Sequence, residues 1–102
     1  MSSFRVAAKV SKIGQGRAKT VELDGKRIAL CNVDGTIYAV DDLCTHDNGP
    51  LGEGELFNGQ IECPRHGARF DVKSGKVMCL PAVIPVKTYE VKVEGEEVKV
   101  RV

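Results

Sequence analysis

Two short segments hold both histidines and two of the four cysteines of the chain. They follow the patterns Cys44-x-His46 and Cys63-x-x-His66, and sixteen residues separate His46 from Cys63. Each segment offers one thiolate and one imidazole, which are side chains that zinc and iron bind well. One such pair cannot surround a metal tetrahedrally. We therefore expect the chain to fold so that the two segments meet at a metal site.

The spacing alone leaves three interpretations of these four residues open. They could be unrelated buried side chains, or a structural zinc site, because two cysteines and two histidines are a common zinc set. Zinc fingers usually take two cysteines from one segment and two histidines from the next, whereas each segment here supplies one of each. Mixed pairs suit a site with two metals, which is the interpretation that we favour.

The sequence is patterned for strands rather than helices. Valine occurs 14 times and isoleucine five times, and both residue types favour strands. Valines alternate with charged residues at about 89–93 and 98–102, which is the period of a strand. Further strands are expected at about Thr20–Leu23, Arg27–Asn32 and Thr36–Val40. Three acid–glycine pairs are expected to form hairpin turns between strands: Asp24-Gly25, Asp34-Gly35 and Glu94-Gly95.

The composition is that of a soluble globular protein, with 42% hydrophobic and 28% charged residues. Its 102 residues suffice for one compact domain and are too few for two. A net charge of +1 gives no support for nucleic-acid binding. No apolar run approaches the roughly 20 residues of a membrane helix, and no secretory signal is recognisable. We therefore expect a cytoplasmic protein that binds neither nucleic acid nor membranes.

Residues 42–80 differ from the sequence on either side. They hold six of the eleven glycines of the chain, together with Pro50 and Pro64. This composition favours turns and loops. We expect an all-β scaffold into which a loop-rich segment carrying both Cys/His pairs is inserted.

At these pairs the sequence resembles the Rieske iron–sulfur family. The family signature is Cys-x-His in one loop and Cys-x-x-His in a second, each followed by glycine-rich sequence. Here the two segments read CTHDNGPLGEGEL and CPRHGARFD. The resemblance implies a single Rieske domain, with an antiparallel β-sandwich base at about 1–41 and 86–102. A cluster-binding subdomain would occupy the segment at about 42–85.

The same resemblance implies one [2Fe–2S] cluster per chain. It assigns Cys44 and Cys63 to one iron, and His46 and His66 to the other. No catalytic residue is expected, because both histidines are already ligands and none remains for a mononuclear iron site. The sequence also contains no Gly-x-Gly-x-x-Gly fingerprint for a nucleotide.

High-potential relatives in respiratory complexes carry two further cysteines that join the loops, and Ser and Tyr hydroxyls that donate hydrogen bonds to sulfur. This chain has Gly49 and Arg65 at the cysteine positions, and Ala68 and Phe70 at the hydroxyl positions. The loss of such donors disfavours the reduced, more negative state. We therefore expect a reduction potential near the low end of the Rieske range, about −150 mV.

The length and motif resemble those of the small Rieske ferredoxins of bacterial ring-hydroxylating dioxygenase systems. This implies a one-electron carrier that is not itself an enzyme. It would pass electrons from a flavin-containing, NAD(P)H-dependent reductase to a terminal Rieske non-haem iron oxygenase. Such a transient carrier is expected to be a monomer. Two other functions stay open: a small accessory subunit of a nitrite-reductase-type complex, and a zinc-stabilised interaction module.

Two cysteines lie outside the metal motifs. Cys31 falls within an expected strand and is interpreted as a buried small hydrophobic side chain. Cys79 precedes residues 80–85, whose sequence LPAVIP resembles the proline-containing loop that covers the cluster in the family. A disulfide between Cys31 and Cys79 is an alternative that a reducing compartment disfavours.

Overall fold

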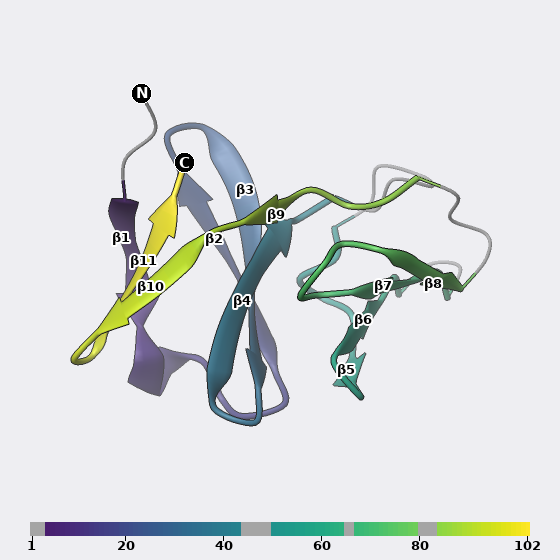
Figure 1. Cartoon of the computed structure of the whole chain (residues 1–102), viewed down its shortest axis with the longest axis horizontal. Coiled ribbons are helices and arrows are strands. Elements are labelled where there is room, and N and C mark those ends of the chain that lie inside the picture. Colours follow the sequence, from purple (N-terminus) through teal and green to yellow (C-terminus); the bar gives the residue numbers. More distant parts are fainter. Residues whose placement is uncertain (1–3, 44–49, 65–66, 80–83) are drawn as a thin grey trace.

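The computed structural model describes residues 4–43, 50–64, 67–79 and 84–102. These residues form three antiparallel sheets that follow one another as layers (Figure 1). The outer sheet has the strand order β1-β11-β10, the central sheet β2-β3-β4-β9 and the third sheet β5-β6-β7-β8. The all-β, antiparallel expectation is confirmed. The elements are β1 (Phe4–Lys9), the 3-10 turn η1 (Val10–Lys12), β2 (Ala18–Leu23), β3 (Lys26–Val33), β4 (Thr36–Asp41), β5 (Leu56–Phe57), β6 (Gln60–Glu62), β7 (Arg69–Asp71), β8 (Val77–Cys79), β9 (Thr88–Tyr89), β10 (Val91–Glu94) and β11 (Glu97–Arg101).

The expected hairpins are present. Strand β2 pairs with β3 across Asp24-Gly25, and β3 pairs with β4 across Asp34-Gly35. All four of these turn residues have positive φ, between 50° and 90°. Two successive positive φ angles are the geometry of a type I′ turn, which matches the twist of the strands that it joins. Strands β10 and β11 form the third expected hairpin.

Strand β3 is buried on both faces, because the central sheet lies between the other two. Five consecutive residues, Ile28 to Asn32, are buried. Side chains alternate between the faces of a strand. Ile28 and Leu30 therefore pack with the buried valines of β11, in what we call the Leu30 core. Ala29 and Cys31 point the other way and pack with side chains of β6 and β7, in what we call the Phe70 core.

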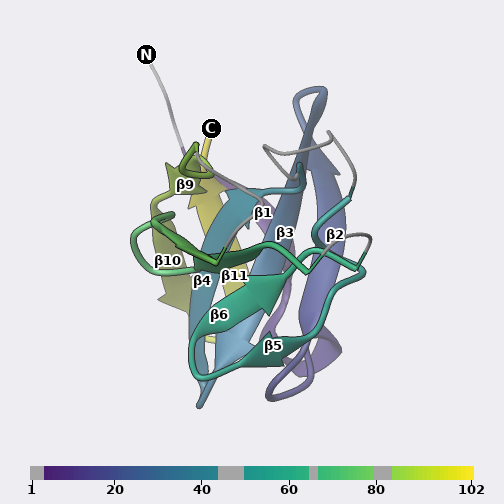
Figure 2. The ribbon, with the colours of Figure 1, turned by 90° about the vertical axis from the view of Figure 1, so that its right-hand side faces the viewer.

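The third sheet is made of strands of two or three residues and lies against the central sheet (Figure 2). The composition of residues 42–80 predicted loops, and these short strands were not predicted. Ile61 of β6 pairs with Phe70 of β7, and both side chains are fully buried. Asn58-Gly59 forms the turn between β5 and β6, again with positive φ at both residues. Within the described residues, no helix is long and apolar enough to cross a membrane.

Gly75 joins the third sheet to the chain that returns to the base. Its amide donates to the carbonyl of Asp71, and its carbonyl accepts from the amide of Val86 at 2.9 Å. Its φ is +79°, and a Cβ at this position would lie 2.1 Å from the carbonyl oxygen of Val86. The close approach of two backbones therefore requires glycine here.

We expect Gly75→Ala to destabilise the protein more than Gly25→Ala does. Both glycines have φ +79°, but a Cβ at Gly25 would meet no atom within 4 Å. Gly25→Ala should cost only the left-handed backbone penalty, about 1–2 kcal/mol. Gly75→Ala adds a steric clash, which we expect to cost about 1–3 kcal/mol more. Urea unfolding of both variants measures the difference, and equal losses would contradict this account of Gly75.

Candidate metal centre

One of the four predicted ligands, Cys63, lies in the described part of the chain. The other three, Cys44, His46 and His66, lie outside the described residues. The chain on either side of them is described, so the ends of both predicted loops are known. The centre is therefore built here from Cys63 and from the residues that flank the loops.

Cys63 lies directly after β6, at the start of the connection to β7. Its amide donates to the carbonyl of Ala68 at 2.6 Å, and its carbonyl accepts from the amide of Gly67 at 3.0 Å. The backbone of Cys63 is therefore fully hydrogen-bonded within its own hairpin. Only its thiol remains to interact with a further group, and that thiol is free rather than part of a disulfide.

The surroundings of Cys63 are apolar. Cys63 is 1% exposed and belongs to the Phe70 core, together with Leu51, Ile61 and Ala68. The hydrocarbon side chains keep water away from the sulfur of Cys63, and a bound metal would balance the charge of its thiolate. Ala68 and Phe70 stand at the positions where the resemblance places hydroxyl groups in the high-potential family members. Both side chains are fully buried in the same core. These surroundings fit a [2Fe–2S] cluster, and at Ala68 and Phe70 they offer its sulfur atoms no hydroxyl group as a hydrogen-bond donor.

The first predicted loop leaves the central sheet at Asp42, a residue that the sequence analysis did not single out. Its side chain is fully buried, and its Oδ1 accepts a hydrogen bond from the amide of Gly52, at the far side of the loop. Its Oδ2 lies 3.1 Å from Nη2 of Arg27, although no donor among the described residues makes a well-aligned hydrogen bond to it. The Asp42 amide donates to the carbonyl of Arg27 at 3.0 Å. No local pattern marks such a residue, because its burial depends on how distant segments pack.

Arg69 flanks the second loop and is held by contacts within the third sheet. Its guanidinium lies 4.3 Å from the ring centre of Phe57, and Nη2 lies 3.6 Å from Oε1 of Glu62. Its Nε is buried and has no hydrogen-bond partner among the described residues. A cation above an aromatic face and beside a carboxylate is favourable in both contacts. Arg69 therefore links β5, β6 and β7 at the end of the sheet that carries Cys63.

Cys31 is a free, fully buried thiol in the central sheet. Burial and, to a smaller extent, the nearby charge of Asp42 together raise its pKa to about 12. Its Sγ lies 3.9 Å from the carbonyl oxygen of Ala29, and the side chain packs among the hydrophobic residues of the Phe70 core. The expectation of a small buried hydrophobic side chain is confirmed. Because the thiol is free, the alternative disulfide to Cys79 is wrong.

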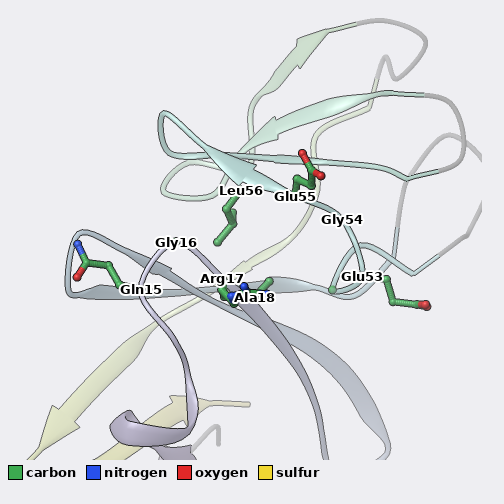
Figure 3. A pocket seen from close by; sticks show the side chains of 9 residues that line it. Gln15, Gly16, Arg17, Ala18, Glu53, Gly54, Glu55 and Leu56 are labelled. Atoms are coloured by element: carbon green, nitrogen blue, oxygen red, sulfur yellow. The ribbon is translucent and has the colours of Figure 1, made fainter.

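An open hollow of about 570 Å³ lies between the central and third sheets (Figure 3). One wall is the segment from Gln15 to Ala18, and the other is the segment from Gly52 to Leu56. Cys63 does not line it. The hollow is thus separate from the described part of the metal centre, but one of its walls is the chain that leaves the first predicted loop.

Known proteins resemble this chain over nearly its whole length. Residues 3–90 match the Rieske [2Fe-2S] domain family. The ferredoxin component of the naphthalene 1,2-dioxygenase system of Pseudomonas aeruginosa is 43% identical over 94 residues, or 92% of this chain and 90% of that protein. The ferredoxin of carbazole 1,9a-dioxygenase from Nocardioides aromaticivorans IC177 has a TM-score of 0.92 at 33% identity, and the match covers 97% of both chains. A chain in the complex of reduced oxygenase and oxidized ferredoxin in carbazole 1,9a-dioxygenase has a TM-score of 0.90 at 33% identity, covering 96% of this chain and 92% of that one.

These similarities agree with the layered all-β structure and with the buried thiol of Cys63. They confirm three expectations from the sequence: the Rieske fold, a [2Fe–2S] cluster as cofactor, and an electron-carrying role in place of a catalytic one. The chain belongs to the Rieske [2Fe–2S] family.

Proposed function

We propose that this protein is the ferredoxin component of a multicomponent ring-hydroxylating dioxygenase. It accepts one electron from a flavin-containing, NAD(P)H-dependent reductase and passes it to a terminal Rieske non-haem iron oxygenase. The observation that carries this proposal is the 43% identity, over 92% of the chain, to a ferredoxin component of such a system. The carrier works as a monomer in the cytoplasm.

In this proposal Cys44 and Cys63 bind one iron, and His46 and His66 bind the other. The bound cluster supplies the chemistry, which is storage of one electron at a time. The segment at about 42–85 holds the cluster, and the base at about 1–41 and 86–102 supports it. The support from the structure is local: the hairpin that follows β6 fixes the backbone of Cys63 and leaves its thiol free.

The protein's own residues have two tasks in this role. The hairpin hydrogen bonds of Cys63 fix where its sulfur lies relative to β6 and β7. Leu51, Ile61 and Phe70 exclude water from that sulfur, because all three are fully buried beside it in the Phe70 core. A sulfur ligand that is fixed in place and shielded from water lies in a region of low dielectric constant. Neighbouring protein groups then have a strong influence on the reduction potential of the cluster.

Reconstitution tests the function directly. The purified holoprotein is mixed with NADH and with the reductase and oxygenase of a naphthalene 1,2-dioxygenase system. We expect NADH-dependent bleaching of the visible bands, and substrate hydroxylation that requires this chain. Cys63→Ser serves as the negative control. A cluster that dithionite reduces, but that passes no electrons to any oxygenase of this class, would contradict the proposal.

The ligand assignment predicts different results for two buried cysteines. Cys31→Ser should leave the visible spectrum and the EPR signal of the reduced protein unchanged, because Cys31 lies within β3 and outside both predicted ligand loops. Cys63→Ser should remove both signals, or change them to those of a weakly bound cluster. Loss of the cluster in Cys31→Ser would show that the wrong cysteine has been assigned.

The apolar surroundings predict the reduction potential. The wild-type potential should lie near about −150 mV, the low end for Rieske centres. Ala68→Ser adds a hydroxyl donor beside Cys63 and should raise the potential by tens of millivolts, within the span of the family. Ala29→Ser is the matched control, since Ala29 is equally buried in the same core but lies on the central sheet. Protein-film voltammetry measures both, and a wild-type potential near the high end of the range would sink the argument.

A further inference from the structure

We propose that Asp42 is a positioning residue that closes the first ligand loop onto the central sheet. It binds no metal itself. It holds the two ends of the loop together and so restricts where the ligands of that loop can lie. The proposal rests on the assignment of Cys44 and His46 as ligands, made above, and it names a residue to which no role has yet been given.

The burial of Asp42 requires an explanation. Its side chain is fully buried, and a carboxylate removed from water is unfavourable unless it is paired and hydrogen-bonded. Arg27 is 60% exposed, and an ion pair whose cation lies in water contributes little. Among the residues that the structure describes, the other polar contact of the side chain is the hydrogen bond that Oδ1 accepts from the amide of Gly52. A hydrogen bond to an ionised acceptor is about twice as strong as a neutral one.

This hydrogen bond joins the two ends of the first loop. Asp42 directly follows β4, and its backbone amide still donates to the carbonyl of Arg27 in β3. Asp42 is thus an extension of the central sheet, with that sheet's rigidity. Gly52 lies ten residues further along the chain. Bonding the exit of the loop to its entry removes much of the freedom of the chain between them.

Gly52 is also pressed against the central sheet. A Cβ on Gly52 would lie 1.9 Å from Oγ1 of Thr20 on β2, and 3.0 Å from Oδ1 of Asp42. The backbone of Gly52 therefore lies close to both side chains, with no room for one of its own. This close approach is what allows the short Asp42 side chain to reach the amide.

The same segment reaches the second ligand loop two residues later. A Cβ on Gly54 would lie 1.7 Å from the carbonyl oxygen of Glu62, the residue before Cys63. The next residue, Glu55, accepts a hydrogen bond from the amide of Glu62 at 2.9 Å. The segment that Asp42 anchors is therefore the same segment that packs against the strand leading to Cys63. One anchor fixes the first loop relative to the second.

Three variants test the role of Asp42. Asp42→Asn keeps an acceptor for the Gly52 amide and loses the charge, whereas Asp42→Ala loses both. Asp41→Ala is the matched control: it removes the neighbouring carboxylate, whose Oδ1 accepts from the hydroxyl of Tyr89 at 2.6 Å rather than from the amide of Gly52. The readouts are the rate at which a chelator removes iron, and the EPR spectrum of the dithionite-reduced protein.

We expect Asp42→Ala to release iron roughly tenfold faster than wild type, the change that loss of one charge-assisted hydrogen bond produces. Its EPR lines should broaden, because the cluster then samples several ligand geometries. Asp42→Asn should lie between wild type and Asp42→Ala in both readouts, because a neutral amide oxygen accepts from the Gly52 amide more weakly than a carboxylate does. Asp41→Ala should match wild type in both, even where its thermal midpoint is lower. A wild-type rate and spectrum in Asp42→Ala, or an equal effect of Asp41→Ala, would overturn the proposal.

A fourth variant changes the donor of the Asp42–Gly52 hydrogen bond instead of its acceptor. Gly52→Ala leaves Asp42 and Arg27 in place but forces the Gly52 amide away from Thr20 and Asp42. Gly52→Ala should reproduce the faster iron release of Asp42→Ala. If Asp42→Ala does not accumulate as folded protein, Gly52→Ala alone tests whether the Asp42–Gly52 hydrogen bond anchors the loop. Wild-type iron release in Gly52→Ala would count against the anchor. Failure of the function proposed above is recognised separately, because wild-type protein would then bind no [2Fe–2S] cluster or fail to transfer electrons.

Discussion

Strand β3 packs two different cores with alternate side chains, and the positions of the other layers follow from this. The large side chains of Ile28 and Leu30 face the outer sheet, and the small ones of Ala29 and Cys31 face the third sheet. A register slip of one residue would exchange the two sets, placing large side chains where Phe70 already fills the space. The size difference therefore fixes the register of the central sheet. Because the third sheet docks on the small-residue face, the same register fixes where the hairpin bearing Cys63 can lie.

The properties of the centre depend on what the Phe70 core lacks. Reduction adds a negative charge to the centre, and that charge is stabilised by hydrogen-bond donors near sulfur. The buried neighbours of Cys63 are hydrocarbon side chains, and Ala68 and Phe70 carry no donor. We therefore expect the packing that keeps water away from the sulfur to keep the potential low as well. In the proposed role, between a flavin and an oxygenase, a high potential would retain the electron.

The parts of the structure that could be predicted are those coded by neighbouring residues. Asp24-Gly25 and Asp34-Gly35 predict their hairpins because few other residue pairs tolerate two positive φ angles. The third sheet escaped prediction because strands of two or three residues are too short to show a period, although Asn58-Gly59 is itself a turn signal. Asp42 escaped for another reason. Its burial follows from the meeting of β3, β4 and the chain beyond the first loop, and no single segment encodes that meeting.

The glycines of the middle segment have a different task from the one that their composition suggested. A glycine-rich stretch is ordinarily interpreted as flexible loop, and the turn glycines of the hairpins do lie in open space. At Gly52, Gly54 and Gly75, however, an added Cβ would lie between 1.7 and 2.1 Å from a neighbouring atom. Each of the three marks a place where the middle segment touches another part of the chain too closely for any side chain. The missing side chains therefore allow close packing on either side of the predicted ligand loops. Gly54 and Gly75 each lie against a backbone carbonyl, and Gly52 lies against the side chains of Thr20 and Asp42.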